Sequence, residues 1–462
     1  MGYRRYPEYK KSGIEWLEQM PSHWGVERLR FSIQTNPTKS EIKHLSENLS
    51  VSFVPMEAVG ELGGLCLDVE KEISEVSNGY SYFADGDVLI AKITPCFENG
   101  KGAIAKGLTN GVGFGTTEFH VLRCESSMNR NYLFYLSVCH AFREIGASQM
   151  LGAGGQKRVT DDFIRDFRVG LPSLLEQEII SDFLDYKTAK IDRLIEKKKE
   201  LIEKLQEQRI ATITHVVTKG IDINVKMKKS GIEWLNSIPQ HWQLGRIKEY
   251  SSTISKGTTP STEGHDTLED GPVRFIKAEN IASQAISEAP KVFISEETNR
   301  KLSRSTLKQG DLLFVIAGAT LGKVAIIDDS ILPANINQAI AFIRPKSSLS
   351  SHYLCYWLES SFIKEITWLY AVQSAQPNLA MGVLGRFPIP LPPKVEQEAI
   401  VQFLNLKTVG FNSMLEKTQQ AITRLQEYRA ALITAAVTGQ IDVRNWQAPE
   451  PIQEPEADKE VA

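Results

Sequence analysis

The segment whose composition comes closest to a phosphate-binding loop is GATLGK at residues 318–323. A loop that cradles nucleotide phosphates follows the pattern G-x-x-x-x-G-K-[ST] and opens a helix. Here the two glycines stand one residue too close, Val324 follows the lysine, and strand-like runs lie on both sides. The segment is therefore interpreted as a turn and not as a nucleotide site.

No other segment carries a catalytic motif. There is no G-x-G-x-x-G opening a βαβ unit and no H-E-x-x-H. Pro392-Pro393 is followed by Lys394, whereas amino-methyltransferases carry an aromatic residue after such a pair. His23 and His241 each precede a tryptophan and are interpreted as core-packing residues. The five cysteines show no C-x-x-C spacing, which argues against zinc and disulfides and favours a reducing cytoplasm. These features indicate a non-enzyme that needs no cofactor.

The sequence contains two copies of the segments that would position binding residues. The run KKSGIEWL at residues 10–17 returns at residues 228–235, and the P-x-HW that begins at Pro21 returns at Pro239. A second match, LP…EQE, begins at Leu171 and again at Leu391. The stretches between these matched ends agree at apolar and turn positions, whereas their polar loops differ. One scaffold with two sets of loops predicts two recognition modules for two different targets.

Each variable stretch predicts a mixed α/β module. The apolar runs VLIAKIT, GAIAKG, FHVLRC, LLFVIAG, KVAIID and AIAFIRP are bounded by Gly, Pro, Asn and Thr and are typical of strands. Residues 131–145 and residues 352–369 each predict one helix. Gly86-Asp87 and Gly310-Asp311, which precede two of the strands, are interpreted as turns and not as functional residues.

The matched segments after each module predict long amphipathic helices. From about residue 175 to 217, and again from about residue 395 to 437, apolar residues recur at spacings of three and four. At the rise of an α-helix, each would reach about 60 Å and would need a partner for its apolar stripe. The other copy is the obvious partner, which predicts an antiparallel pair related by a pseudo-two-fold axis. The alternative is that each helix lies on its own module.

The composition is that of a folded chain without a membrane span. Of the 462 residues, 42% are hydrophobic, no apolar run is long enough to cross a membrane, and the first residues lack the apolar core of a secretory signal. The net charge is −3, but residues 447–462 alone carry one basic and five acidic side chains and are expected to be disordered. Because the remainder is near neutral, any nucleic-acid contact needs locally arranged basic groups.

The order of module, helix, module, helix resembles the specificity subunit of type I restriction–modification systems. The resemblance covers nearly the whole chain except the acidic tail. It rests on the SGIEWL…P-x-HW opening, the LP…EQE helix start and the run RLQEYRAALITAAVTGQID at residues 424–442. Further marks of the family stand in the modules, at Thr94-Pro95, Asn99-Gly100-Lys101, GTTEF (115–119), GGQKR (154–158), GTTP (257–260) and QPNL (376–379).

The resemblance implies two α/β (α+β) target-recognition domains joined by two long antiparallel coiled-coil helices, a pseudo-two-fold tandem repeat. The expected boundaries are 1–172 for the first recognition domain, 173–219 for the first helix, 220–392 for the second recognition domain, 393–438 for the second helix and 439–462 for the tail. The rigid helices would fix the separation of two DNA half-sites near one turn, roughly 10 bp.

The resemblance also implies a non-catalytic cytoplasmic protein that acts on double-stranded DNA, with one domain reading each half of a bipartite asymmetric site. Two modification subunits, which bind S-adenosylmethionine, would sit on the helices and methylate a flipped adenine in each half. Where a restriction subunit exists, two copies with ATP and Mg²⁺ would complete the nuclease. The chain itself would need no cofactor, metal or membrane.

The residues expected to contact DNA are basic and amide side chains on the module loops. Arg and Lys suit guanine or phosphate, Asn and Gln suit adenine, and the glycines around Gly152 would let the backbone approach phosphates. In the first module they are Lys92, Thr94, Asn99, Lys101, Gln156, Lys157 and Arg158. In the second they are Lys256, Thr258, Thr259, Thr320, Lys323, Asn337, Gln338, Gln376 and Asn378. The alternative for each is a loop residue that caps a turn or faces solvent.

Two other functions are compatible with part of the sequence. A scaffold or antirestriction-type protein would bind modification subunits through the same helices without productive DNA recognition, although two intact modules of similar length argue against a decoy. A free-standing enzyme is disfavoured by the missing motifs.

Overall fold

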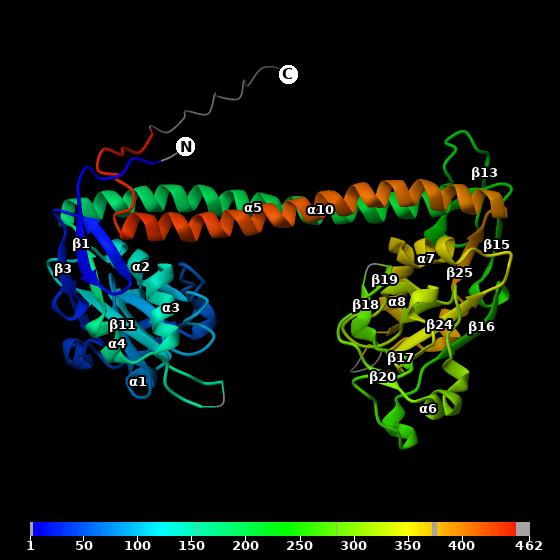
Figure 1. Cartoon of the computed structure of the whole chain (residues 1–462), viewed down its shortest axis with the longest axis horizontal. Coiled ribbons are helices and arrows are strands. Elements are labelled where there is room, and N and C mark those ends of the chain that lie inside the picture. Colours follow the sequence, from blue (N-terminus) through cyan, green and yellow to red (C-terminus); the bar gives the residue numbers. More distant parts are fainter. Residues whose placement is uncertain (1–2, 154, 283, 372–376, 450–462) are drawn as a thin grey trace. The chain divides into compact units, whose positions relative to one another are not determined.

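A computed structural model describes residues 3–153, 155–282, 284–371 and 377–449 of the chain. The chain divides into two units, residues 1–197 with 420–462, and residues 198–419. Each unit holds one α/β module and parts of two long helices, α5 (Leu174–Lys219) and α10 (Lys394–Val437) (Figure 1). Residues 450–462 of the acidic tail lie outside the described residues. In the described ranges, no helix is long and apolar enough to cross a lipid bilayer.

The module of the first unit contains two four-stranded sheets, in the orders β6-β5-β10-β7 and β4-β11-β8-β9, and the strand pairs β1-β2 and β3-β12. The strands are β1 (Tyr9–Ile14), β2 (Leu17–Pro21), β3 (Gly25–Arg28), β4 (Ile33–Thr35), β5 (Ser50–Val54), β6 (Glu70–Glu72), β7 (Ser81–Ala84), β8 (Val88–Ala91), β9 (Gly102–Ile104), β10 (Val112–Gly115), β11 (Phe119–Cys124) and β12 (Arg168–Leu171). The shorter helices are α1 (Ile73–Val76), α2 (Arg130–Val138), α3 (His140–Ser148) and α4 (Asp161–Asp166).

The module of the second unit repeats this topology. The order β16-β24-β21-β22 matches β4-β11-β8-β9, and the parallel pair β17-β23 matches the parallel pair β5-β10. The strands are β13 (Met227–Lys229), β14 (Ser237–Pro239), β15 (Gln243–Arg246), β16 (Ser251–Lys256), β17 (Val273–Ile276), β18 (Ile281–Ala282), β19 (Ala285–Ile286), β20 (Phe293–Ile294), β21 (Leu312–Val315), β22 (Val324–Ile326), β23 (Ala334–Ile336), β24 (Ile340–Pro345) and β25 (Pro388–Leu391). The shorter helices are α6 (Glu296–Lys301), α7 (Ser351–Glu359), α8 (Ser361–Ala371) and α9 (Met381–Leu384).

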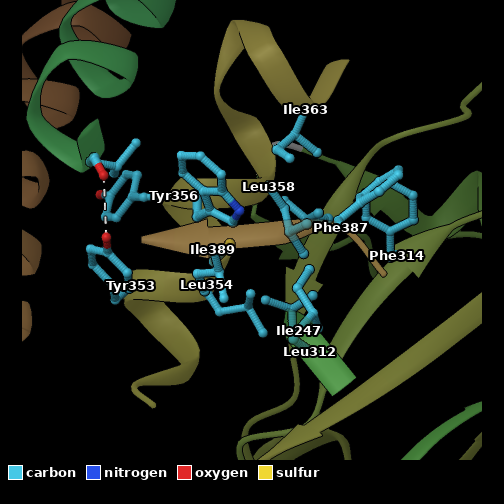
Figure 2. Close-up of a cluster of buried hydrophobic side chains, with 14 of the residues drawn as sticks. Ile247, Leu312, Phe314, Tyr353, Leu354, Tyr356, Leu358, Ile363, Phe387 and Ile389 are labelled. Carbon is cyan, nitrogen blue, oxygen red and sulfur yellow. Dashed lines mark hydrogen bonds between the residues drawn. The ribbon is translucent and has the colours of Figure 1, made fainter. Parts of the chain in front are cut away.

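The central strand of the second module is buried on both faces, which explains its continuous apolar run. Alternation along β21 sends Leu312 and Phe314 into one apolar cluster and Leu313 and Val315 into another. Side chains from α7 and β25 complete the first cluster (Figure 2). Each fully buried side chain of this size contributes about 1.5–3 kcal/mol, so the cluster that joins sheet and helix holds β21 firmly in place.

The Gly-Asp pairs before β8 and β21 are turns, as predicted. Gly86 and Gly310 have φ angles of +95° and +81°. The buried carboxylates that follow accept a backbone N–H across the turn and pair with an arginine on the neighbouring strand. These pairs are Asp87–Arg123 and Asp311–Arg344, each with N–O distances of 2.7 Å.

The prediction of one helix at residues 131–145 and one at residues 352–369 was wrong in one respect. Each segment forms two helices, with Cys139 between α2 and α3 and Ser360 between α7 and α8. Both residues are buried and extended, with ψ angles of 150° and 151°. Neither Gly nor Pro marks the change of direction, and the apolar spacing continues across it, so the sequence pattern alone gives no signal.

The two long helices run antiparallel to each other within each unit. In the first unit, the guanidinium of Arg429 on α10 donates to Asp192 of α5 at 3.0 Å. In the second unit, Ile213 of α5 shares an apolar cluster with Ile400 and Leu404 of α10. The first unit contains the start of α5 and the end of α10, and the second unit contains the reverse. Each long helix thus contacts the other copy, as predicted, and in the second unit both also pack on the module. Leu194, Leu201 and Met414 of the predicted apolar stripes remain exposed.

The glutamine of LP…EQE ties each long helix to its module. Gln177 is fully buried, donates to the carbonyl oxygens of Ser127 and Pro172 at 3.0 Å, and accepts the backbone N–H of Asn129 at 2.7 Å. The same three bonds recur in the second unit, between Gln397 and Ser348, Pro392 and Ser350. An amide with all of its main partners in place can be buried without a net cost.

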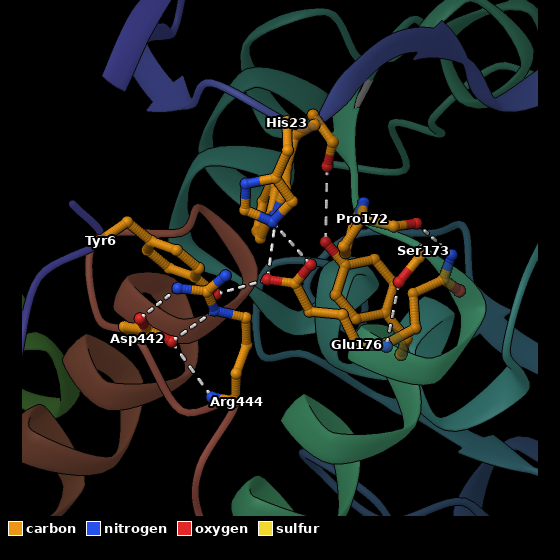
Figure 3. A network of polar contacts seen from close by, with 11 residues as sticks. Tyr6, His23, Pro172, Ser173, Glu176, Asp442 and Arg444 are labelled. Atoms are coloured by element: carbon orange, nitrogen blue, oxygen red, sulfur yellow. Dashed lines mark hydrogen bonds and ion pairs between the residues drawn. The ribbon is translucent and has the colours of Figure 1, made fainter. Parts of the chain in front are cut away.

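The glutamate before Gln177 is the centre of a polar network (Figure 3). Glu176 is 5% exposed and accepts hydrogen bonds from the hydroxyl of Tyr6 at 2.7 Å and from the indole of Trp24 at 3.1 Å. Burial and the adjacent carboxylate raise the pKa of Tyr6 far above its ordinary value. The guanidinium of Arg444 lies over the Tyr6 ring, 4.9 Å from its centre. The start of α5 is thus joined to the N-terminal segment and to the segment after α10.

The interpretation of His23 and His241 as core-packing residues was wrong. Their side chains are 44% and 46% exposed, and their Nε2 atoms lie 2.8 and 2.7 Å from the carboxylates of Glu176 and Glu396. The buried member of each P-x-HW motif is the tryptophan, and the histidine stays at the rim because the helix-start carboxylate holds it there.

The repeated threonines and glycines at the helix ends have local and tertiary roles. The hydroxyls of Thr434 and Thr214 accept the first backbone N–H of α3 and of α8, at 3.3 and 2.9 Å, which fixes the breaks before those helices. Gly439 has a φ angle of +70°, and a Cβ there would lie 2.4 Å from Pro21. Because both the backbone conformation and the close approach exclude a side chain, only glycine fits.

Candidate nucleic-acid interface

In the first module, two of the predicted loops meet where β8 ends. The backbone N–H of Lys92 donates to the carbonyl of Glu118, and the carbonyl of Lys92 accepts from Val159, both at 2.9 Å. The N–H of Thr94 donates to the carbonyl of Lys157 at 3.0 Å. This ladder brings together the predicted residues Lys92, Thr94, Gln156, Lys157 and Arg158.

The side chains of this group differ in their availability. Gln156 and Lys157 are exposed and can offer an amide and a cation to a ligand. Arg158 is engaged, because its guanidinium makes two bonds of 2.9 Å to Glu118 and thereby lowers the pKa of that carboxyl. The Thr94 hydroxyl donates to the carbonyl of Lys157 at 3.2 Å and braces the loop.

Asn99 and Lys101 lie farther along the same loop. The exposed amide of Asn99 donates to Glu61 at 3.1 Å, and the half-buried ammonium of Lys101 donates to the carbonyl of Met56 at 3.1 Å. Lys101 therefore braces the neighbouring segment, whereas Asn99 remains at the surface.

In the second module, the predicted residues gather at the matching end of the sheet. Lys256 is the last residue of β16, and the N–H of the next residue, Gly257, donates to Ile340 at 3.1 Å. The N–H of Ile316, the first residue after β21, donates to Ala339 at 2.8 Å. These bonds bring residues 256–259, residues 337–338 and the turn 318–323 to one edge. The GATLGK segment is a turn between β21 and β22, as predicted.

The loops in this edge are held by close backbone contacts. At Gly257 a Cβ would lie 1.9 Å from the carbonyl oxygen of Ile336, so Thr258 and Thr259 follow a segment that only glycine allows. The Thr320 hydroxyl donates to the carbonyl of Ala278 at 3.3 Å. Both threonines after Gly257 are half-buried.

The remaining predicted residues of this module differ in exposure. Lys323, Gln338 and Asn378 are exposed, and Asn378 pairs through its backbone with Ala317. Asn337 is half-buried, and its side-chain oxygen finds no hydrogen-bond partner in the described part of the chain. Gln376 lies outside the described residues.

Sequence reasoning missed a second polar group at the same sheet end of the first module. The amide of Asn36 donates to Asp161 at 2.9 Å, and Nδ1 of the buried His120 lies 2.7 Å from the same carboxylate. His120 lowers the pKa of Asp161 chiefly through this contact. The available signal was the Asn36-Pro37 turn after β4, because its place matches that of Gly257 after β16.

A buried arginine supports loop 92–101 from behind and was also missed. Arg143 of α3 is buried, lies over the ring of Phe97 at 4.6 Å, and donates to the carbonyl of Phe97 at 2.8 Å. Burial lowers the pKa of Arg143 to about 9. Its Nε and Nη2 atoms have no partner among the residues that the structure describes.

Arg143→Met is expected to loosen this loop with little loss of global stability. Methionine removes the bond to Phe97, but it also removes a buried and incompletely paired charge, so the two effects offset to within about 1–2 kcal/mol. Amide hydrogen exchange of residues 95–101 should accelerate severalfold while the midpoint of urea unfolding changes little. Unchanged exchange in the loop, or collapse of the whole first unit, would contradict this role.

Comparisons with known proteins agree with this architecture. The sequence model of the type I restriction modification DNA specificity domain matches residues 33–204 and again residues 239–424. The type I restriction enzyme EcoAI specificity subunit of Escherichia coli is 41% identical over 164 residues, which are 35% of this chain and 27% of that subunit. The MjaVIII specificity subunit of Methanocaldococcus jannaschii is 26% identical over 323 residues, 69% of this chain and 72% of that one. The matched part is thus about a quarter of the E. coli relative's length.

Two solved structures share the fold. A chain from a study of complex assembly and conformational transition of the type I R-M system has a TM-score of 0.72 at 18% identity and covers 91% of this chain and 99% of its own length. The HsdS subunit of Thermoanaerobacter tengcongensis has a TM-score of 0.50 at 18% identity, covering 91% and 98%. Because the family model matches both modules and most of the chain, this protein belongs to the type I restriction–modification DNA specificity family.

Proposed function

We propose that this chain is the non-catalytic subunit that reads DNA for a type I restriction–modification complex, with one module for each half of a bipartite asymmetric site. The observation that carries the proposal is a comparison of the two modules of this chain with each other. The two modules share strand order and helix contacts, yet the exposed donors stand on different loops. The first module presents Gln156 and Lys157 between α3 and α4, and the second presents Lys323 between β21 and β22 and Gln338 between β23 and β24. Donors at different places on one scaffold are what two different half-sites require.

The helices are the proposed docking region for two modification subunits. α5 and α10 carry exposed apolar side chains at equivalent places, Leu175 with Val395 and Leu194 with Met414. A repeated apolar position on a solvent-facing helix favours the same partner at both copies. Those partners would flip and methylate adenine, and restriction subunits would join them. The five free cysteines support a reducing, cytoplasmic setting.

Exchange of one module tests this function. The chain is co-expressed with its modification subunits, and methyladenine is mapped across the host genome. The wild-type complex is expected to give one bipartite motif. Replacing residues 25–165, within the proposed first recognition domain 1–172, by the same segment of another family member should change one half of that motif completely and leave the other half intact.

The matched control exchanges the corresponding part of the second module, which should change only the other half-site. If both halves change together, the assignment of one module to each half-site is wrong. If a stable complex forms but methylates no motif, the chain is a scaffold or antirestriction-type protein instead.

A further inference from the structure

A groove in the second module combines apolar side chains with two cations. It has a volume of about 850 Å³, which falls in the usual range for a ligand site. Trp234, Leu369 and Tyr370 line it, and the last two are 70% and 51% exposed. The exposed Arg246 and Arg386 line the same groove. An exposed apolar surface with charged residues beside it is typical of a binding site.

The first module neutralises the corresponding place with an ion pair of its own. Arg28 ends β3 as Arg246 ends β15, and each of these strands pairs with the strand that precedes a long helix. Asp166 and Arg386 lie two residues before those partner strands, β12 and β25. The guanidinium of Arg28 donates to Asp166 at 3.1 Å. The second module therefore has an arginine where the first has the aspartate that completes the pair.

The cations of the second module lack such a partner. Neither Arg246 nor Arg386 makes an ion pair with any residue that the structure describes. The backbone N–H of Lys248 donates to Gly385 at 3.0 Å, which brings a third exposed cation beside Arg386. The carboxylate of Glu249, which also lines the groove, accepts the backbone N–H of Arg246 at 2.9 Å. Neighbouring cations without counter-charges favour an occupant that brings carboxylates.

The groove lies away from the candidate DNA-binding loops of the same module. Arg246 precedes β16, whereas Lys256, one of the candidate DNA-binding residues, ends it. The six residues of this strand span about 20 Å. A phosphate backbone at the arginines would also leave the apolar lining around Trp234 uncovered. A peptide that carries both carboxylates and apolar side chains matches both parts of the lining.

This chain contains a segment with that composition. Residues 447–462 carry five acidic side chains and one basic side chain, with three prolines and Ile452 among them. Proline-rich segments bind as extended chains in grooves lined by aromatic side chains. We propose that residues 447–462 of a second copy of this chain occupy the groove, with their carboxylates on the two arginines and their apolar side chains against Trp234.

Binding of a synthetic peptide tests the groove. A fluorescent peptide with the sequence of residues 447–462 is titrated with the full chain, whose own five acidic tail residues are replaced by Gln or Asn so that they do not compete. Arg386→Asp should weaken binding about tenfold, because it restores the ion pair of the first module and repels the peptide. Arg386→Lys keeps the charge and should retain most of the affinity. Arg304→Asp, at an exposed arginine of the same unit outside the groove, is the control and should leave binding unchanged.

Self-association identifies the source of the occupant. Sedimentation velocity of the wild-type chain should show association that grows with protein concentration, and both Arg386→Asp and the neutralised tail should abolish it. Equal peptide affinity in Arg386→Asp, or no peptide binding at all, overturns the inference. Peptide binding without self-association of the wild-type chain rules out the second copy as the occupant. If Arg386→Asp weakens only the binding of duplex DNA, the groove is a nucleic-acid contact and the inference is wrong. The DNA-reading function stands or falls separately, by methylation mapping.

Discussion

Replacing Glu176 by glutamine is expected to lower the free energy of unfolding of the first unit by about 3 kcal/mol, three times the loss from Glu396→Gln in the second unit. Glu176 is nearly inaccessible and receives Tyr6, Trp24 and His23. The glutamine side chain has one neutral acceptor oxygen in place of the two charged oxygens of glutamate. Its NH₂ group would face a hydrogen-bond donor. The buried Tyr6 and Trp24 and the exposed His23 would all lose a charged partner, and the group that faces the NH₂ would also lose its acceptor.

The second repeat supplies the matched control. Glu396 receives Trp242 at 3.0 Å and lies 2.7 Å from His241, but its side chain is 29% exposed. The position that corresponds to Tyr6 holds Asn224, which is exposed. Water can therefore replace most of the hydrogen bonds that Glu396→Gln removes. The loss in the free energy of unfolding of the second unit should be about 1 kcal/mol.

Peptide-resolved amide hydrogen exchange in urea is the measurement, because it reports the two units separately. Exchange in the first turns of α5 should respond to Glu176→Gln, and exchange in the first turns of α10 to Glu396→Gln. Glu178→Gln, at the exposed third position of the EQE motif, should leave both unchanged. Equal losses in the two units would mean that burial of the carboxylate is not what makes the first network strong.

Asp311→Asn is expected to destabilise the second unit by about 3–5 kcal/mol. The carboxylate is completely buried, binds the guanidinium of Arg344 through two contacts of 2.7 Å, and accepts the N–H of Lys308 at 2.8 Å. These bonds to Asp311 raise the pKa of Arg344. The guanidinium of Arg344 is only partly exposed. With asparagine at position 311 it would lose its counter-charge at the turn that starts β21.

A double-mutant cycle with Arg344→Met checks this explanation by urea unfolding. If the loss comes from the stranded cation, adding Arg344→Met to Asp311→Asn should restore a large part of the stability. Asp87→Asn in the first unit should cost less, because Arg123 retains a second carboxylate, Glu41, at 2.5 Å. If the losses of unfolding free energy from the two substitutions simply add, the turn and not the ion pair accounts for the effect of Asp311→Asn.

Much of the fold follows from local patterns that the sequence displays directly. The repeat of SGIEWL and of LP…EQE is a property of the chain itself, and spacings of three and four over some forty residues leave few alternatives to a long helix. The apolar runs at β8 and β21 and the Gly-Asp turns before them are equally local. The structure confirms these predictions because each depends on residues close together in sequence.

The candidate site was predictable only in part. Its loops could be found because Gly, Pro, Asn and polar residues interrupt the strands, and Gln156, Lys157, Lys323 and Gln338 are exposed as a binding residue must be. The engagement of Arg158 by Glu118 could not be found, because the two residues lie forty positions apart and meet only through the ladder after β8. The support that Arg143 gives to the loop at Phe97 could not be found either, because these two residues are also far apart in sequence.

The sequence by itself therefore determined that there are two copies of one scaffold, two long amphipathic helices and two different sets of polar loops. Tertiary structure alone decided where α3 and α8 begin, since their first N–H groups bind Thr434 and Thr214 on helices distant in sequence. It also placed His23 and His241 at the rim, since the carboxylates that hold them start the long helices. The spacing of apolar residues reflects which side chains of one helix or strand are buried. The features decided by tertiary structure depend instead on hydrogen-bond partners that another element supplies.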